Sequence, residues 1–117
     1  MQTVSQLREA CARLPGSAET FPFGLDTLVL KVGGKMYALI GLNGEPLALS
    51  LKCDPERAEA LRREHEQITP GYHLSKRHWN TLTLGEGLPD ELVSQLLAHS
   101  YALVVGSLTK AQRAELG

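Results

Sequence analysis

The stretch T-L-V-L-K-V-G-G-K-M-Y-A-L-I-G-L-N-G-E-P-L-A-L-S-L-K, residues 27–52, decides the fold. Leu28, Leu30 and Val32 share one face by alternation, as do Leu47, Leu49 and Leu51, and Gly33-Gly34 and Asn43-Gly44 separate the apolar segments. Alternation with a period of two is typical of strands buried on one face, and such short glycine breaks are typical of hairpin turns. The stretch therefore predicts three antiparallel strands, at 27–32, 35–42 and 47–51.

Helices are predicted on both sides of this stretch. Residues 3–14 and 89–105 repeat apolar side chains every three or four positions, as a helix packed on one side does. Asp54-Pro55 places a capping residue before a proline in the first helical position, so a further helix is expected to about residue 66. A short helical tail is expected at 109–116. The rigid F-P-F-G loop at 21–24 is expected to close its rings over one end of the core.

Two more strands are expected at about 72–76 and 79–84. The order α-βββ-α-ββ-α predicts a two-layer α+β fold, in which helices cover one face of an antiparallel sheet. The chain is expected to form one domain, residues 1–117. The predicted core consists of Leu28, Leu30, Leu47, Leu49, Leu51, Leu82 and Leu84 from the sheet and Leu7, Leu61, Leu92 and Leu96 from the helices. The other sheet face is expected to carry Lys31, Ser50, Lys52, Trp79, Thr81 and Thr83.

Composition limits the classes of function. The chain has 117 residues, a formal net charge of −1 and two cysteines. Two isolated cysteines argue against a disulfide framework, and the apolar runs are too short to span a bilayer. No signal peptide is recognised, so a cytoplasmic protein without a membrane association or cofactor is expected. A dedicated nucleic-acid binder usually carries a basic excess, so any such role must rest on a local patch.

The segment T-P-G-Y-H-L-S-K-R-H-W-N, residues 69–80, is the best candidate for such a patch. Lys76 and Arg77 are suited to phosphate contacts, Asn80 to a base edge, and Trp79 to stacking on an unpaired base. A purely structural alternative is also open. In that alternative Trp79 packs over the sheet, Asn80 caps the turn, and the two cations are solvated.

Metal and thiol chemistry have weaker support in the sequence. His73 and His78 lie five positions apart, so on an extended strand they point to opposite faces, and no metal site is predicted. Cys53 lies beside Lys52 at an expected helix N-terminus, a position that can lower the pKa of a thiol. It lacks a recognisable base, so the sequence favours Cys53 as a packing residue and no catalytic residue is predicted.

Several motifs together resemble the MmcQ/YjbR family of small bacterial proteins. They are F-P-F-G at 21–24, K-V-G-G-K-M-Y-A-L at 31–39, L-S-L-K-C-D-P at 49–55, the 69–80 segment, L-P-D-E at 88–91 and H-S-Y-A-L-V at 99–104. The resemblance implies a two-layer α+β fold and a DNA-binding function through a double-wing arrangement. It nominates as site residues Lys76, Arg77, His78, Trp79 and Asn80.

The expected function is therefore that of a non-enzymatic binding module. DNA is the favoured ligand, bound by the nominated residues with help from Lys31, Lys35 and Lys52. A protein-interaction or chaperone-like domain, including a homodimer, is the alternative, and it would use the open sheet face. An enzyme that depends on Cys53 is the third possibility.

Overall fold

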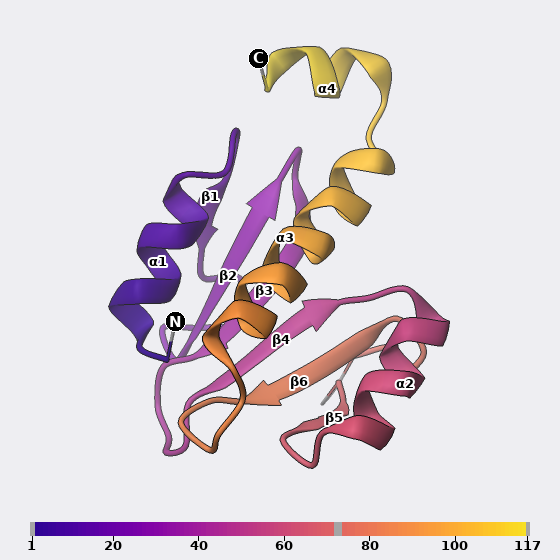
Figure 1. Ribbon diagram of the computed structural model, residues 1–117. Helices are drawn as coiled ribbons and strands as arrows, with labels where there is room; N and C mark the ends of the chain where they lie inside the picture. The colour runs from indigo at the N-terminus through magenta and orange to yellow at the C-terminus, as the bar shows by residue number, and fades with distance from the viewer. Residues whose placement is uncertain (1, 72–73, 117) are drawn as a thin grey trace.

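The computed structural model describes residues 2–71 and 74–116. A six-stranded antiparallel sheet, ordered β1-β2-β3-β4-β6-β5, carries its helices on one face (Figure 1). The predicted α+β class is confirmed. In chain order the elements are α1 (Val4–Ala12), β1 (Ala18–Thr20), β2 (Thr27–Val32), β3 (Lys35–Gly41), β4 (Ala48–Lys52), α2 (Pro55–Glu64), β5 (Ile68–Pro70), β6 (Trp79–Thr83), α3 (Asp90–Gly106) and α4 (Lys110–Glu115).

The register of the central strands aligns their apolar positions in rows. Leu28 pairs with Ile40, Ile40 with Leu49, and Leu49 with Leu82. Because neighbouring residues on a strand point to opposite faces, this register sends the residues of these rows toward the helices. The alternation shifts once, opposite Leu30 and Lys31, where the consecutive β3 residues Tyr37 and Ala38 both enter the core. The β2–β3 turn is Gly33-Gly34, with φ of +58° and +79°, as the primed turns of two-residue hairpins require.

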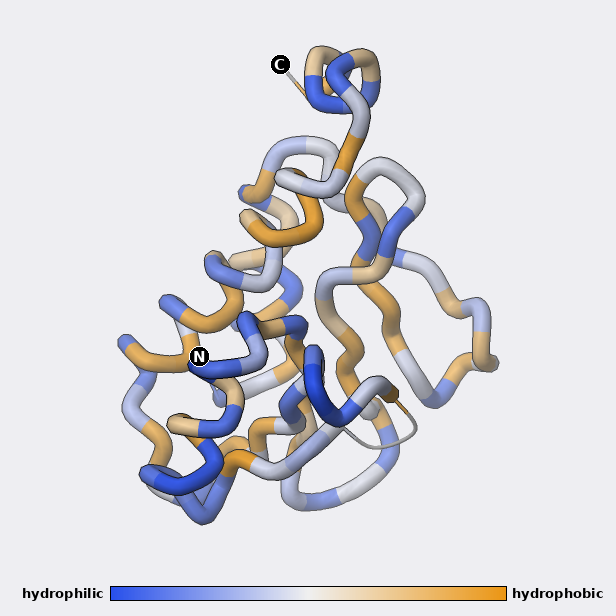
Figure 2. The backbone as a smooth tube through the Cα atoms, turned by 90° about the vertical axis from the view of Figure 1, so that its right-hand side faces the viewer, coloured by the Kyte–Doolittle hydropathy of each residue, from blue (hydrophilic) through white to orange (hydrophobic). Residues whose placement is uncertain are grey.

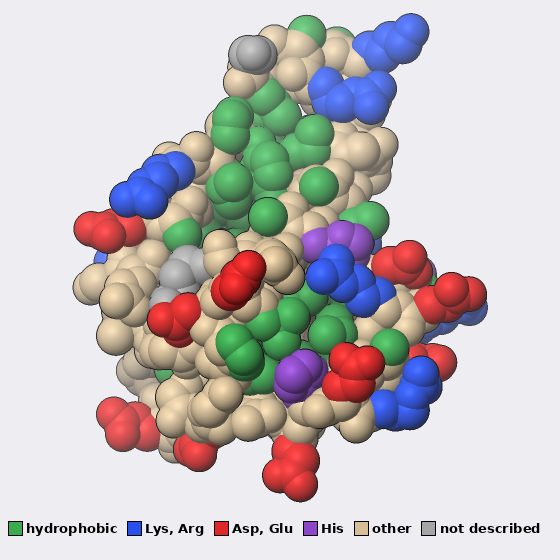
Figure 3. All heavy atoms as spheres, in the orientation of Figure 1, with side chains coloured by type: hydrophobic (Ala, Val, Ile, Leu, Met, Phe, Trp, Pro, Cys, Tyr) green, Lys and Arg blue, Asp and Glu red, His purple; other side chains and the backbone are tan. Residues whose placement is uncertain are grey.

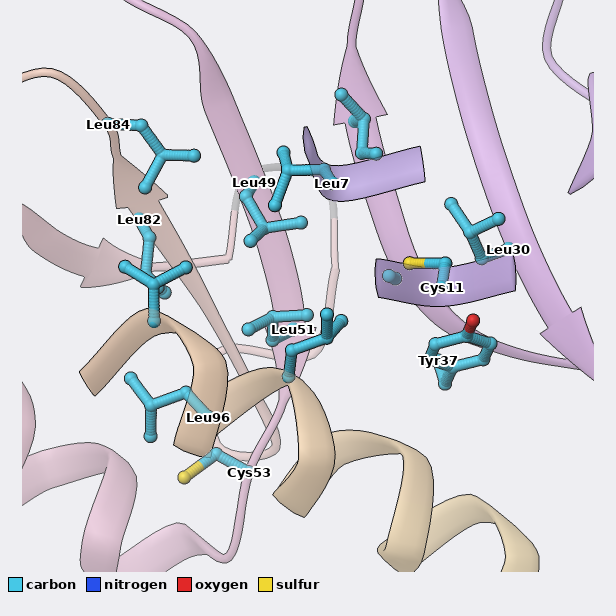
Figure 4. Packing of buried hydrophobic residues seen from close by; sticks show 14 of the residues in the cluster. Leu7, Cys11, Leu30, Tyr37, Leu49, Leu51, Cys53, Leu82, Leu84 and Leu96 are labelled. Carbon is cyan, nitrogen blue, oxygen red and sulfur yellow. The ribbon is translucent and has the colours of Figure 1, made fainter. Parts of the chain in front are cut away.

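The hydrophobic core lies between the sheet and the helices (Figure 4). Nine of the predicted core leucines are buried: Leu7, Leu28, Leu30, Leu49, Leu51, Leu61, Leu82, Leu84 and Leu96. The other two, Leu47 and Leu92, are half-buried against the cluster. The alternation that predicted the sheet face is therefore confirmed.

The helix ends follow the expected chemistry. The Asp54 side chain accepts a hydrogen bond from the Glu56 amide and Pro55 occupies the first turn of α2, as predicted. Helix α3 has no charged side chain from Leu92 to Gly106, and hydrophobic side chains gather over it on the helix-covered face (Figure 3). Within the described residues, no helix combines the length and the apolar character needed to cross a membrane.

Two strand predictions need correction. The predicted strand at about 72–76 is wrong in its described part, because Leu74 lies in a bend and residues 76–78 form a turn; Tyr72 and His73 lie outside the described residues. The strand that pairs with β6 is instead β5, which ends at Pro70. The edge strand β1 is not predicted, because three residues are too short to show an alternation.

Leu49→Ala tests the assignment of the buried face. Leu49 is fully buried at the centre of the sheet, so the substitution should lower the free energy of unfolding by ~2–5 kcal/mol in a urea titration. Leu39→Ala is the matched control, because Leu39 lies half-buried on the opposite face of the adjacent strand and should cost about 1 kcal/mol or less. Equal losses for the two variants would contradict the assignment.

Candidate functional site

The sheet face that points away from the helices, called the open face below, is only partly exposed. Its central residues are Thr27, Val29, Lys31, Leu39, Gly41, Ala48, Ser50, Lys52, Trp79, Thr81 and Thr83. Val29 and Trp79 are buried, yet neither belongs to the core on the helix side. Loops must therefore cover parts of this face, and Figure 2 shows chain segments that project from the sheet on the side opposite α3.

The first of these loops is residues 21–26, called the tip below. The Gly24 amide donates to the Phe21 carbonyl at 3.3 Å, and the Thr27 amide donates to the Gly24 carbonyl at 3.5 Å. Gly24 has φ of +106°, a conformation that side chains other than hydrogen strongly disfavour. The tip is thus a defined turn held between β1 and β2.

The tip exposes its large apolar side chains. Phe21 is 43% exposed, Phe23 65% and Leu25 80%. The expectation that the two rings close over one end of the core is wrong, because neither belongs to the core cluster. Apolar side chains grouped on one exposed loop are typical of interaction sites rather than of ordinary surface.

The second loop, which joins β5 to β6 and of which Gly71 and residues 74–78 are described, lies against Trp79. A side chain at Gly71 would place its Cβ 2.8 Å from the Cβ of Trp79, so only glycine permits this approach. The Gly71 amide donates to the Trp79 carbonyl at 2.9 Å, and the Trp79 amide donates to the Ser75 carbonyl at 2.9 Å. Trp79 is only 8% exposed, so its ring is not free to stack on a base and the structural alternative describes it better.

A groove of about 480 Å³ lies in the open face between these two loops. Its lining residues are Phe23, Thr27, Leu39, Gly41, Ala48, Ser50, Leu74 and Thr81. The hydroxyls of Ser50 and Thr81 lie 2.8 Å apart and share a hydrogen bond in an otherwise mainly apolar lining. A concave, mainly apolar surface with a few polar groups is the usual form of a binding site.

Positive charge gathers at one end of the groove. Lys31 and Lys52 each follow a groove-face residue by two positions on their strands, so they lie about 7 Å beyond the Val29 and Ser50 positions. A row of paired residues, Leu30, Ala38, Leu51 and Asn80, crosses β2, β3, β4 and β6. Lys31 directly follows Leu30 and Lys52 directly follows Leu51, and Lys52 pairs with Trp79. The open face therefore brings these two predicted cations to the same end.

The turn before β6 extends this positive end. Lys76, Arg77 and His78 are exposed, and the Cys53 amide donates to the His78 carbonyl at 2.8 Å. On the other side, the Arg62 guanidinium donates to the Lys76 carbonyl at 2.8 Å and ties the turn to α2. The three nominated side chains thus lie at the end of the sheet where Lys52 lies, outside the groove.

Lys35 does not belong to this group. Its ammonium group donates to the carbonyl and hydroxyl of Ser107, each at 3.3 Å, at the C-terminal end of α3. A cation is stabilised there by the partial negative charge of the helix end. The expectation that Lys35 supports a ligand surface with Lys31 and Lys52 does not fit this position.

Acidic side chains lie at the opposite end of the groove. Asp26 closes the tip immediately before β2, and its carboxylate accepts a hydrogen bond from the Asn43 amide group at 2.7 Å. Glu45 is exposed in the segment that joins β3 to β4. The groove is therefore positive at one end and negative at the other.

Asn80 points to the other side of the sheet. It pairs with Leu51, is 2% exposed, and donates from Nδ2 to the Ala58 carbonyl of α2 at 3.3 Å. Its Oδ1 has no hydrogen-bond partner among the described residues, and the side chain borders a cavity of about 10 Å³, which is near the size of one water molecule. A role for Asn80 at a base edge does not fit this buried position.

Cys53 lies in the core, as expected of a packing residue. Burial raises the pKa of the Cys53 thiol, and the nearby Arg57 lowers it to a smaller extent, so the thiol form is favoured at neutral pH. The His99 imidazole accepts a hydrogen bond from the Asp54 amide at 3.3 Å, and burial and Arg57 lower the pKa of this histidine. Among residues 2–71 and 74–116, no group of three His, Cys, Asp or Glu side chains is placed to hold a metal ion.

Comparison with known proteins places this geometry in a family. A sequence model of the YjbR family matches residues 12–103. The chain belongs to the YjbR family. It is 33% identical over 111 residues to the uncharacterized protein YjbR of Escherichia coli K12, covering 95% of this chain and 94% of the relative. It is 37% identical over 98 residues to the uncharacterized protein YbdF of Escherichia coli O157:H7, covering 83% and 80%.

Solved structures share the fold. The crystal structure of Deinococcus radiodurans protein DR2400 matches with a TM-score of 0.94 and 54% identity, covering 100% of this chain and 89% of that protein. A Pseudomonas syringae protein matches with a TM-score of 0.75 and 26% identity, covering 87% and 98%. Both proteins therefore share the fold of this chain.

Sequence reasoning missed the groove and the exposed tip. The alternation along β6 places Thr81 and Leu82 on opposite faces of the sheet. It places Asn80 on the same, helix-covered face as Leu82, so the sequence contains a signal for the burial of Asn80. No comparable signal exists for the tip, because the direction in which a loop leaves the sheet depends on contacts distant in sequence.

Proposed function

We propose that this chain is a non-enzymatic protein-interaction module whose groove binds an extended apolar segment of a protein partner. One observation carries the proposal: a groove of about 480 Å³ on the open face has an exposed aromatic side chain, Phe23, in its wall. The proposal places the module in the cytoplasm, where its two free, buried cysteines would stay reduced.

The exposed apolar surface supports a protein partner. A phenylalanine ring buries about 150–250 Å² when it is covered, and each Å² of apolar surface removed from water contributes about 25 cal/mol. Phe23 and Leu25 keep most of this surface in water, although the chain has a closed core elsewhere. An apolar segment in the groove would bury Phe23 together with the floor formed by Leu39 and Ala48.

The hydroxyls in the groove would orient a bound segment through hydrogen bonds. The backbone groups of the central strands are paired with one another, so the floor offers side-chain rather than backbone hydrogen bonds. A hydroxyl has one donor and two acceptor positions, so the Ser50 side chain keeps hydrogen-bonding capacity after its bond to Thr81. A peptide N–H or C=O group is a suitable partner for it.

The distribution of charge favours a segment of mixed charge over a continuous polyanion. A nucleic-acid strand that follows the groove away from Lys52 would approach Asp26 and Glu45, which repel phosphate. A peptide that carries an acidic residue toward Lys31 and Lys52 avoids this repulsion. The net charge of −1 adds no long-range attraction for a polyanion.

Nucleic-acid binding, which the sequence favours, is the second candidate. The supporting observation is the common position of Lys31, Lys52, Lys76 and Arg77 at one end of the sheet. Because Trp79 and Asn80 are buried, this surface offers phosphate contacts without stacking or base readout by those two residues. Binding would then be independent of sequence and weak at physiological salt.

Selection from a random peptide library tests the first candidate. Peptides that bind the immobilised chain should share an apolar anchor, and fluorescence anisotropy should then measure their affinity in solution. Leu39→Glu places a carboxylate on the groove floor and should weaken binding at least tenfold. Ala98→Glu adds the same charge to the exposed side of α3 and should leave affinity unchanged. Equal affinities for the two variants would exclude the groove.

A salt titration tests the second candidate. If the positive end binds DNA, replacing Lys76 and Arg77 together by Ala should flatten the slope of log affinity against log salt concentration by up to ~2. Gel retardation and anisotropy with single- and double-stranded oligonucleotides provide the measurement. If the wild-type chain retards neither the single-stranded nor the double-stranded oligonucleotide on a gel at low salt, the nucleic-acid candidate fails.

A further inference from the structure

We infer that the groove binds the tip of a second copy of this chain, so that two copies pair through their open faces. The inference rests on the proposed function and names the partner of the same groove. It follows from a comparison of what the groove requires with what the tip offers. The groove requires an apolar anchor and a negative charge, and the tip carries Phe23 and Leu25 followed directly by Asp26.

The tip is suited to insertion because its shape exists before binding. The two turn hydrogen bonds of Gly24 and the ladder bond from the Leu42 amide to the Asp26 carbonyl, at 2.8 Å, fix its backbone. A preorganised loop loses less conformational entropy on binding than a flexible segment does. With 80% of its side chain exposed, Leu25 is available as the anchor without any rearrangement of its own chain.

Charge complementarity gives the pairing a direction. Asp26 is next to the anchor on the tip, and Lys31 and Lys52 are next to the groove on the receiving chain. An anchor seated in the partner groove with Asp26 toward the positive end would bring these opposite charges together. The reverse orientation would place Asp26 near the acidic end of the partner groove and is disfavoured.

Two-fold symmetry would use the contact twice. In such a pair the tip of each chain occupies the groove of the other. Each residue contact then occurs twice, as it does in two-fold homodimer interfaces. Covering two tips and two grooves would remove on the order of 1,000 Å² of surface from water, near the lower limit for specific protein interfaces. The expected complex is therefore a reversible dimer with a dissociation constant on the order of micromolar.

Charge exchange between two variants tests this arrangement. Sedimentation equilibrium should show that the wild-type chain associates. Asp26→Lys and Lys52→Glu should each weaken association at least tenfold, because in either variant residues 26 and 52 of the two chains carry like charges at both contacts. An equimolar mixture of the two variants should recover the association. In a mixed pair one contact has the natural charges and the other has both charges reversed.

Two further variants control the experiment. Leu25→Asp should abolish association without loss of fold, since the residue is exposed, and thermal unfolding would verify the fold. Ala98→Glu on α3 should leave association unchanged. Dimers that persist in Asp26→Lys, Lys52→Glu and Leu25→Asp would overturn the inference, as would a mixture that does not recover.

The outcomes separate this inference from the proposed function. A wild-type chain that stays monomeric at all concentrations, yet binds selected peptides in the groove, would overturn the self-pairing and leave the protein-interaction function standing. Failure of both peptide binding and association would overturn both. A monomeric chain that binds oligonucleotides through Lys52 would assign the positive end to nucleic acid and would also overturn the self-pairing.

Discussion

The alternation of side chains along β2, β3, β4 and β6 is the constraint on which the rest of the structure depends. Because the strands pair in register, one set of residues forms a continuous apolar surface that the helices must cover. A shift of one residue in any central strand would exchange its two faces. The same register collects hydroxyls, lysines and small side chains on the other face, where no helix packs.

Two loops decide what this second face can do. The connection between β5 and β6 holds Trp79 in place, through a contact that only a glycine at position 71 permits. The tip shields the sheet on its other side but leaves Phe23 and Leu25 in solvent. The groove lies between the two loops and is lined by Phe23 of the tip and Leu74 of the second loop. The proposed binding function rests on this arrangement of the two loops.

Much of the fold could be predicted from residues close in sequence. The Gly33-Gly34 turn, the Asp54-Pro55 cap and the leucine stripes are local signals, and the structure confirms them. The strand expected near 72–76 is wrong in its described part, 74–76, because the alternation there is short and the actual partner of β6 ends at Pro70. Asn80 was assigned to a ligand surface by its residue type, although its partner, the Ala58 carbonyl, lies on a helix that sequence spacing cannot place.

A ligand can bind only if the groove is open to solvent, and the rate at which a thiol introduced by Ser50→Cys is labelled measures this access. Ser50 lies on the groove lining, whereas the natural cysteines, Cys11 and Cys53, are buried. At a chain concentration well below the expected dissociation constant, where self-pairing is minor, a small disulfide reagent should modify the introduced thiol at least tenfold faster than either natural thiol. Equal protection of all three thiols in the folded chain, with full reaction after unfolding, would show that the open face is closed and would contradict the account.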